Sequence, residues 1–538
     1  RFPTSLEGDF MARPLFVRGA VALAALALTG AAQAAALRIA GANDILTFDP
    51  HAQNHQTTLA YQQMVYEALV RYNEKYEVEP SLATKWTFVT PTQLRFELRK
   101  GVKFHDGAPL TADDVVFSIT RVMTPPSNLT AYVQSVKEVK KVDDGTVDLI
   151  LKAPSPTVLR ELTDARIMNK AWAEKNNAVK AQDYKAKEEN FAARNANGTG
   201  PFILEAWQPD TKTTLKKNDA WWDKPRGNVD NIVFTPIKAA ATRSAALLSG
   251  QVDMVVDPPV QDLERIKRDP NIHVIEGAEN RTIFIGFDQF REELLGSNIK
   301  GKNPLKDKRV RQALYQAVDI AAIERNVMRG LGKPTGTMIA PMVNGWTKEL
   351  AARASKFDIE AAKKLLADAG YPQGFELTLD CPNDRYLNDE AICQAITSMW
   401  TKIGVKTKLQ TNPMAIHSAK IQKYEVSAYL LGWGVATFDA LYSLDSLIST
   451  VDTQGGAAGN FNCGRMSDAK VDGLIQQIKS EMDAKKRTGD IHQALQLVKD
   501  NYNYLPLHDQ IRPWAMRKGV TTVHRADDRP MVIWTTVK

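Results

Sequence analysis

Arg385 is the side chain in this sequence that best fits the chemistry of anion binding. It stands in the segment Asn383–Tyr386, shortly after a predicted strand that ends near Asp380. Loops beyond the carboxyl ends of strands are favoured ligand positions in α/β sheets, and a planar guanidinium matches a carboxylate. Two interpretations are open: Arg385 binds a carboxylate of a ligand, or it is a surface residue paired with Asp384 or Asp389.

A second candidate binding element is the segment Gly432-Trp433-Gly434, which follows a predicted strand over Glu425–Leu431. Glycines let a ligand approach the backbone, and the indole of Trp433 offers a flat wall for a ligand side chain. The alternative is that Trp433 is an ordinary core residue. The flanking glycines favour the binding interpretation.

Two histidines have a spacing that could bind a metal. His51 and His55 lie four residues apart, as two ligands on one helix face would. Pro50 favours a turn at this point, and no acidic or cysteine residue completes a ligand set; His417 is isolated. We therefore expect solvated loop histidines, and we predict neither a metal site nor a cofactor.

Enzyme signatures are missing from the sequence: it has no nucleophile elbow, zinc-binding helix, P-loop or dinucleotide fingerprint. The pair Asp113-Asp114 does not converge, because consecutive helical side chains point about 100° apart. Asp114 instead stands three residues after Thr111, as in a helix capping box. We expect a protein that is not an enzyme; a secreted hydrolase using Asp106, Asp439 and Asp445 is the remote alternative.

The pattern of apolar residues predicts an α/β fold. Asp358 is the predicted cap of a helix over 359–369, and a strand (375–380), a helix (387–402) and a second strand (405–410) follow it as a βαβ unit. The polar segment 171–197, rich in Ala, Lys and Glu, is predicted to be helical.

Three ordered blocks carry a resemblance to one bacterial family. The first, Leu98–Arg121 (LRKGVKFHDGAPLTADDVVFSITR), combines a strand, a turn and a capped helix; the others are Gly198–Pro225 and Asp307–Asp319. With these blocks the chain resembles the peptide/nickel class of extracellular solute-binding proteins, which serve ABC importers. The resemblance implies a two-lobed α/β fold of the periplasmic-binding-protein type, with hinge-linked lobes and an extra subdomain inserted in the N-terminal lobe.

The same resemblance implies boundaries for these parts. The first lobe is expected over 35–57, 198–282 and 511–538, the inserted subdomain over 58–197, and the second lobe over 283–510. Residues 1–34 are expected to be upstream residues and a signal peptide.

The resemblance also assigns roles to candidate site residues. An arginine at the position of Arg385 holds a ligand's carboxylate, and the loop after Trp433 usually has acidic residues three and six positions later, the first of which receives an amino group. Here these positions are Ala436 and Asp439, so either Asp439 binds the ligand's cation or the ligand has no free α-amine. Backbone groups of Asn280, Arg281 and Thr282 would pair with an extended ligand, and Asn43 and Asp44 would lie at the cleft edge.

The expected function is that of a periplasmic receptor that delivers a di- or oligopeptide, or a peptide-like solute, to the permease subunits of an ABC importer. A non-peptide ligand on the same fold (a nickel chelate, haem, glutathione, a sugar or an organic acid) is the alternative. We expect a monomer that is not embedded in the membrane.

Residues 11–34 have the features of a cleavable signal peptide. Met11 is followed by the basic residues Arg13 and Arg18, a short apolar run over 20–28, and the exit Ala32-Gln33-Ala34. We expect cleavage after Ala34 and export to the periplasm.

Composition excludes nucleic acid as a partner. The chain has 69 basic and 62 acidic residues, a formal charge of +7 over 538 residues, and no block of Lys and Arg. Its three cysteines allow a disulfide between Cys381 and Cys393, which sequence alone does not establish, and leave at least one thiol unmatched, Cys463 in that case.

Overall fold

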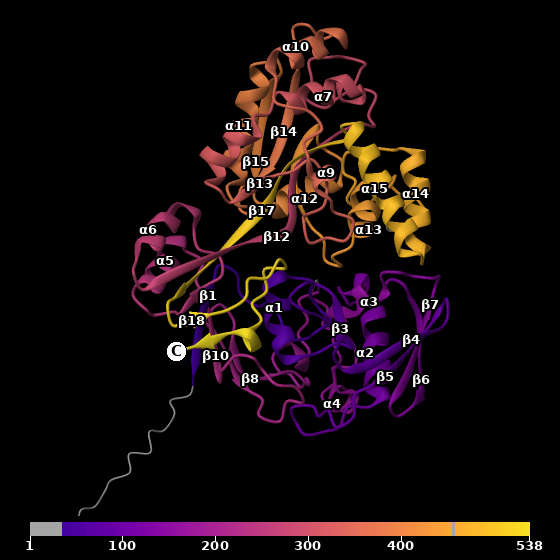
Figure 1. The fold of residues 1–538 in the computed structure, drawn as a ribbon, viewed down its shortest axis with the longest axis vertical. Coiled ribbons are helices and arrows are strands. Elements are labelled where there is room, and N and C mark those ends of the chain that lie inside the picture. The colour runs from indigo at the N-terminus through magenta and orange to yellow at the C-terminus, as the bar shows by residue number, and fades with distance from the viewer. Residues whose placement is uncertain (1–34, 185, 455–457) are drawn as a thin grey trace, which may run out of the picture. The chain divides into compact units, whose positions relative to one another are not determined.

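The structure is a computed structural model that describes residues 35–184, 186–454 and 458–538 (Figure 1). The predicted signal peptide and its cleavage site lie outside these residues. Within them, no helix has both the length and the apolar character needed to cross a membrane.

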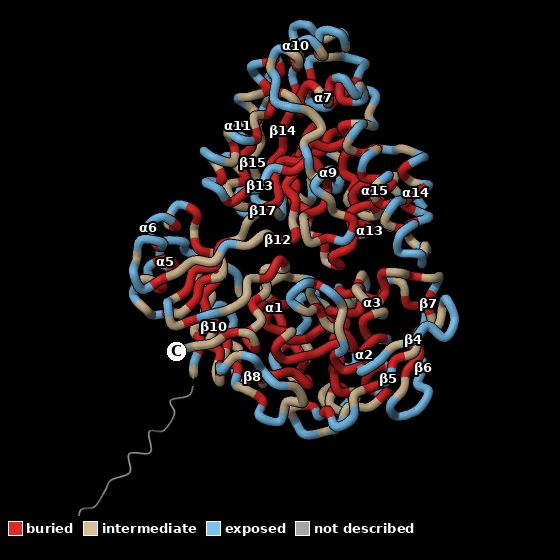
Figure 2. The backbone as a smooth tube through the Cα atoms, in the orientation of Figure 1, coloured by how far each residue is buried: buried red, intermediate tan, exposed pale blue. Residues whose placement is uncertain are grey.

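The fold is α/β, as predicted, and centres on one large sheet. Eleven strands of the described chain form it, in the order β15 (Lys406–Asn412), β14 (Glu376–Pro382), β16 (Ala428–Gly434), β12 (Ile272–Phe287), β17 (Tyr504–Arg517), β11 (Met254–Val255), β1 (Ala36–Gly41), β10 (Asn231–Pro236), β9 (Lys212–Lys217) and β8 (Phe202–Gln208), with β13 (Gly332–Pro334) paired to β17. Buried residues run along the inner strands β14, β16 and β17 (Figure 2).

Three smaller sheets complete the β-structure. A four-stranded antiparallel sheet has the order β4 (Ala83–Thr90), β5 (Gln93–Leu98), β7 (Thr146–Leu151) and β6 (Val136–Asp143). The two-stranded sheets pair β2 (Val70–Tyr72) with β3 (Val78–Pro80), and β18 (Val520–Thr521) with β19 (Thr536–Val537).

The helices are distributed along the whole described chain. They are α1 (Gln56–Val65), α2 (Ala112–Met123), α3 (Val158–Glu161), α4 (Lys170–Lys175), α5 (Ala240–Leu248), α6 (Leu263–Arg268), α7 (Lys308–Gln316), α8 (Ile320–Ile323), α9 (Lys348–Ala351), α10 (Ile359–Asp368), α11 (Asp389–Thr401), α12 (Met414–Gln422), α13 (Ala440–Ser443), α14 (Ala469–Ser480) and α15 (Ala484–Asp500).

Two long strands, β12 and β17, connect the two ends of the large sheet. They pair antiparallel from Ile272 opposite Arg517 to Gly286 opposite Tyr504, and the register shifts between Ala278 and Thr282. β12 also pairs with β16, and β17 also pairs with β11. Residues 279–281 have no β17 partner in this register. Their backbone groups that face β17 can therefore form hydrogen bonds with other segments.

Local capping signals are confirmed. The main-chain N–H of Thr111 donates to Asp114 Oδ2 at 2.9 Å at the start of α2, and Ala361 N–H donates to Asp358 Oδ1 at 2.9 Å at the start of α10. The predicted βαβ unit is confirmed as β14, α11 and β15, with the two strands parallel. Gly432-Trp433-Gly434, however, lies within β16 instead of following it.

The prediction of a helix over 171–197 is wrong beyond α4. Asn177 has a φ of 54°, and the segment after it is mostly irregular, with a short 3-10 turn at Phe191–Ala193. The physical reason is tertiary: the carbonyls of Ala178, Val179 and Lys180 accept hydrogen bonds from the guanidinium of Arg121. These carbonyls therefore accept hydrogen bonds from a buried charge and not from the N–H groups of a continued helix.

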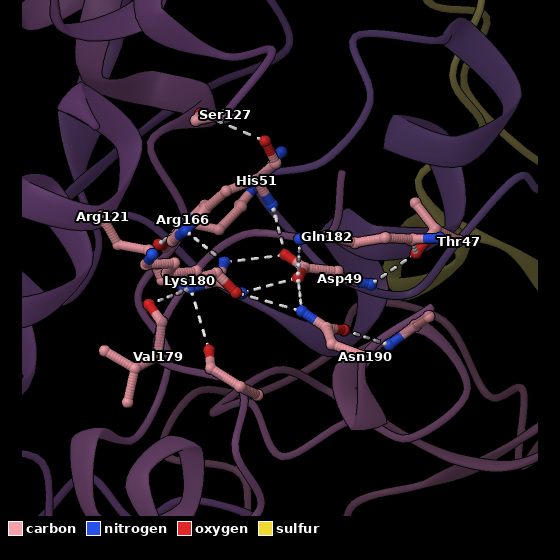
Figure 3. A network of polar contacts seen from close by, with 12 residues as sticks. Thr47, Asp49, His51, Arg121, Ser127, Arg166, Val179, Lys180, Gln182 and Asn190 are labelled. Atoms are coloured by element: carbon pink, nitrogen blue, oxygen red, sulfur yellow. Dashed lines mark hydrogen bonds and ion pairs between the residues drawn. The ribbon is translucent and has the colours of Figure 1, made fainter. Parts of the chain in front are cut away.

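Arg121 belongs to a buried polar network that also contains His51 (Figure 3). Its Nη1 and Nη2 donate to Asp49 Oδ1 and Oδ2 at 2.7 and 2.6 Å. Burial acts to raise the pKa of Asp49, but the charge and hydrogen bonds of Arg121 outweigh it and hold the pKa at about 2. The pair thus holds the 178–180 segment against the loop around Asp49, which precedes α1.

The expectation of solvated histidines is wrong for His51, which is fully buried. Burial first, and the charge of Arg121 second, lower its pKa to about 3, so the ring is neutral. Arg121 Nη1 lies 2.9 Å from Nδ1, and Nε2 lies 2.8 Å from the carbonyl of Arg166. Since Arg121 can only donate, Nδ1 accepts and Nε2 carries the proton. Both ring nitrogens are engaged, which leaves neither for a metal.

The structure joins Cys381 of β14 to Cys393 of α11 by a disulfide, which resolves the question that the sequence left open. Cys463 is a buried free thiol whose pKa burial raises to about 12. It is therefore a packing residue and not a reactive one.

We predict that Arg121→Met destabilises the protein by about 3–5 kcal/mol, because it leaves the carboxylate of Asp49 buried without its counter-ion. Chemical denaturation of the variant measures this loss. Lys141→Met is the matched control, because Lys141 and Asp113 form an exposed pair that contributes little. Equal stability of the Arg121 variant and the unaltered protein would contradict a structural role for the network.

We also predict a pH-dependent effect at the β12–β17 pairing. Asp509 is buried and accepts a hydrogen bond from Thr282 Oγ1 at 2.7 Å. Burial raises its pKa to about 7, whereas an unfolded-state aspartate ionises near pH ~4. The native state therefore holds an extra proton between these values and loses stability as the pH rises through this range.

Asp509→Asn keeps the acceptor oxygen and removes the titration. We expect it to raise the melting temperature at pH 8, by a stabilisation on the order of a few kcal/mol, and to change it little at pH 4.5. Thermal unfolding at both pH values measures the difference. A variant that is equally destabilised at both pH values would show that ionisation of Asp509 does not destabilise the native protein.

Candidate ligand-binding site

A cavity of about 240 Å³ brings together segments that are far apart in the sequence. Its wall includes residues of 54–72, residues 279–281 of β12, Arg385, residues between 434 and 442, and the segment 525–533. Below, "the cavity" means this space. Of the predicted site residues, Asn280, Arg281, Arg385 and Gly434 line it, and the other six do not.

Arg385 is exposed on the cavity wall, and no salt bridge of its guanidinium occurs among the described residues. The two carboxylates that could have paired with it are used elsewhere. Asp384 Oδ1 accepts from Met414 N at 2.7 Å, and Asp389 Oδ2 accepts from the main-chain N–H groups of Arg385 and Tyr386 at 3.0 and 2.9 Å. The loop is therefore fixed by its backbone while the guanidinium stays available.

A second arginine lies close to Arg385. The charge of Arg281 is the largest cause that lowers the pKa of Arg385, which places two cations on the same wall. Arg281 is compensated, since its Nε donates to Glu279 Oε1 at 2.9 Å and its Nη1 donates to the carbonyl of Gly432 at 3.2 Å. The other oxygen of Glu279 accepts from Gln510 Nε2 at 2.6 Å.

The main chain of Asn280 is occupied by the protein itself. Its N–H donates to the carbonyl of Ala526 at 2.8 Å, and its carbonyl accepts from Val435 N at 3.0 Å. Thr282 is buried and pairs with Trp433 on one side of β12 and Asp509 on the other. This interior position of β12 contrasts with the expectation that its backbone pairs with an extended ligand.

Trp433 lies beside the site and does not form its wall. The ring is buried, stacks on Tyr442 with centroids 5.4 Å apart, and packs on Phe461 at 4.8 Å. A Cβ on Gly432 would lie 2.5 Å from Ile283 Cδ1 and 2.7 Å from Tyr386 Cε1, so close packing requires this glycine. The buried, packed ring of Trp433 agrees with the alternative that Trp433 is a core residue.

Asp439 lies in a buried ion pair away from the cavity. Arg487 Nη1 and Nη2 donate to its two oxygens at 2.9 and 2.7 Å, and Asn344 Nδ2 donates at 2.9 Å. Its Oδ1 also caps α13 by accepting from Leu441 N at 3.0 Å. Ala436, by contrast, lines the cavity, so neither position presents a carboxylate to a ligand.

Asn43 and Asp44 also lie away from the cavity wall. Asn43 is exposed, and Asp44 Oδ2 accepts from Asp210 N at 2.7 Å. His55, in contrast, is close to the site: its pKa is lowered by burial first and then by the charge of Arg385, and its Nδ1 lies 3.1 Å from Thr58 Oγ1.

Sequence reasoning missed a charged group contributed by two distant segments. Asp164 Oδ2 accepts from Arg529 Nη1 at 2.7 Å, and its Oδ1 accepts from Arg166 Nη2. Asp164, Arg166 and Arg529 all line the cavity, as does the ion pair of Arg525 with Asp527. The charge density of 525–529 was the available signal, but nothing near it in the sequence indicated its partners.

An aromatic cluster closes one side of the cavity. Phe438 stacks on Tyr76 with centroids 4.0 Å apart and meets Tyr72 edge-on at 5.2 Å. Tyr72 Oη donates to the carbonyl of Thr437 at 2.9 Å. The loop after β16 is thus in direct contact with the hairpin β2–β3.

Comparisons with known proteins give the family of the chain. Residues 77–455 match the model of the bacterial extracellular solute-binding proteins, family 5 Middle. The heme-binding protein A of Haemophilus influenzae is 29% identical over 475 residues, which cover 83% of this chain and 82% of that protein.

Two further relatives extend the match. The dipeptide-binding protein of Escherichia coli is 29% identical over 518 residues, 91% of this chain and 90% of the relative. The structure of HbpA2 from Haemophilus parasuis superposes with a TM-score of 0.77 at 27% identity, covering 94% of this chain and all of that one. These matches confirm the predicted two-lobed periplasmic-binding-protein fold.

The family match spans more than half of the chain, and the relatives align with nearly all of the described fold. The chain therefore belongs to family 5 of the bacterial extracellular solute-binding proteins, the solute-binding components of ABC importers.

Proposed function

We propose that this protein captures a peptide-like solute through its carboxylate and delivers it, chemically unchanged, to the permease of an ABC importer from the periplasm. The observation that carries the proposal is the guanidinium of Arg385, which faces the cavity without an ion-pair partner among the described residues. An unpaired cation beside a second arginine favours an anion, and a carboxylate accepts two parallel hydrogen bonds from this group.

The relatives differ in their named ligands, which include heme, dipeptides and glutathione. All three kinds of molecule carry carboxylates, so Arg385 provides one anchor that suits each of them. Among these we favour a peptide-like solute, because the side-chain amides of Asn54, Gln56 and Gln63 line the cavity and suit the hydrogen-bonding groups of a peptide main chain.

The proposed capture involves movement of two lobes about β12 and β17. We assign residues 35–57, 198–282 and 511–538 to one lobe, 58–197 to its inserted subdomain and 283–510 to the other. Closure would remove the solute's charges from water, where charge-assisted hydrogen bonds contribute most.

The direct test of the proposal is to identify the natural ligand. The protein is purified without unfolding from its own host, and the small molecules that denaturation releases are identified by mass spectrometry. A released carboxylate-bearing peptide or peptide analogue supports the proposal. A bound sugar or a metal complex without a carboxylate would contradict it, as would turnover of the ligand by the protein.

We predict that Arg385→Gln weakens binding of a carboxylate-bearing ligand by about 2 kcal/mol or more, because the ligand's charge is buried without its partner. Isothermal titration calorimetry measures the change. Arg309→Gln is the control, since Arg309 is an exposed arginine on α7, outside the cavity, that pairs with Asp307. Equal affinities of both variants would remove Arg385 from the site.

We further predict that deletion of residues 11–34 leaves the protein in the cytoplasm, because the basic residues, apolar run and cleavage site of an export signal are removed together. Osmotic-shock fractionation followed by immunoblotting measures the distribution. Recovery of the deleted form in the periplasmic fraction would show that export does not depend on this segment.

A further inference from the structure

The cavity wall carries more positive than negative side chains. Six arginines and four carboxylates contribute to it: Arg71, Arg166, Arg281, Arg385, Arg525 and Arg529, and Glu67, Asp164, Glu279 and Asp527. Their pairing decides where the excess charge lies and what ligand would neutralise it.

The part of the wall around Glu67 has no excess positive charge. Arg71 is paired with Glu79 at 2.8 Å and with Asp223 at 2.9 Å. The oxygens of Glu67 accept from the indoles of Trp221 and Trp222 at 3.2 and 2.9 Å, and from Thr199 Oγ1 at 2.8 Å. Glu67 is buried, and these bonds hold its carboxylate within the protein.

The first excess positive charge is shared by Arg166 and Arg529. Both guanidiniums bind the single carboxylate of Asp164, so two cations are matched by one anion. The Nε atoms of both arginines are buried and have no hydrogen-bond partner among the described residues. Arg525 and Asp527 balance each other in the same segment and do not change this excess.

The second excess positive charge is Arg385. Its neighbour Arg281 is matched by Glu279, and Arg512, whose charge also acts on Glu279, is matched by Asp528 at 3.2 Å. Arg385 is then the cation of this group for which the described residues supply no anion.

Each carboxylate of the wall already accepts hydrogen bonds from groups of the protein. Asp164, Glu279 and Asp527 each bind a guanidinium, and Glu67 is held by three donors. Asp439 is bound by Arg487 away from the cavity, and Ala436 occupies the wall beside it. A free α-ammonium beside Arg385 or the Arg166–Arg529 pair would therefore meet excess positive charge.

We propose that the site selects a dianionic solute that has two separated carboxylates and no free α-amine, such as an N-acylated peptide with an acidic side chain. Arg385 binds one carboxylate, and the Arg166–Arg529 pair binds the other. This inference rests on the proposed function and specifies the class of ligand for the same site.

Four synthetic ligands test the inference on the unaltered protein: Ala-Gln, Ala-Glu, N-acetyl-Ala-Gln and N-acetyl-Ala-Glu. They vary the second carboxylate and the free amine independently at nearly constant size. In calorimetry, we expect Glu in place of Gln to tighten binding at least tenfold in both series. We expect acetylation to tighten binding as well, because it removes an ammonium group from beside excess positive charge.

Each other outcome is informative. If acetylation weakens binding, or if Glu gives less than a tenfold gain, the inference is overturned while capture of a peptide-like carboxylate stands. If none of the four binds, both the inference and the peptide part of the proposed function are wrong.

A variant then locates the second carboxylate. Arg529→Gln should reduce the tenfold difference in affinity between N-acetyl-Ala-Glu and N-acetyl-Ala-Gln, both measured on the variant, to less than threefold. Arg194→Gln is the matched control, because Arg194 forms an exposed pair with Glu189 outside the cavity. Retention of the Glu gain in the folded Arg529 variant would exclude the Arg166–Arg529 pair as the second anchor, and the ligand series above does not depend on this variant.

Discussion

The antiparallel pairing of β12 with β17 is the constraint on which the site depends. It joins segments more than 200 residues apart, and each strand also pairs with a strand of a different part of the sheet. A regular ladder here would occupy both edges of β12 with backbone bonds. The register shift after Ala278 interrupts that ladder, and the carbonyl of Ala526 takes the N–H of Asn280 instead. The interruption therefore brings 279–281 and the charged segment 525–529 to one cavity.

The charges of that cavity follow from the cost of burial. A buried guanidinium is strongly destabilising unless an anion lies beside it, and most arginines of the wall have one. Arg281 and Arg525 are matched pairwise, whereas Arg166 and Arg529 share Asp164. Arg385 stays exposed, so water can solvate it until a ligand replaces the water. The same physical rule that stabilises the fold thus leaves Arg385 as a position where the charge of the proposed ligand would bind.

Local sequence predicts features whose interacting residues are close in the chain, and it does not predict features whose partners are distant. The caps at Thr111 and Asp358 and the βαβ unit depend on residues within a few positions or one adjoining helix, and they are confirmed. The environment of Asp439 depends on Arg487, 48 residues later, and that of Arg121 on Asp49, 72 residues earlier. Such partners leave no periodic or motif signal. Arg385 was identified because the strand before it, and not a distant partner, determines its position.

Charged and aromatic residues make different kinds of contact at the cavity. The cavity wall is charged, but the contact of the β16 loop with Tyr72 and Tyr76 is made by an aromatic ring, Phe438. Phe438 has a φ of 50°, a conformation that costs on the order of 1 kcal/mol for a non-glycine residue, and the burial of its ring offsets this cost. This aromatic contact is insensitive to the ligand's charge, and it stabilises the arrangement found in the structure whatever the ligand is. In the proposed function, contacts that depend on the solute's charge are therefore left to the arginines of the wall.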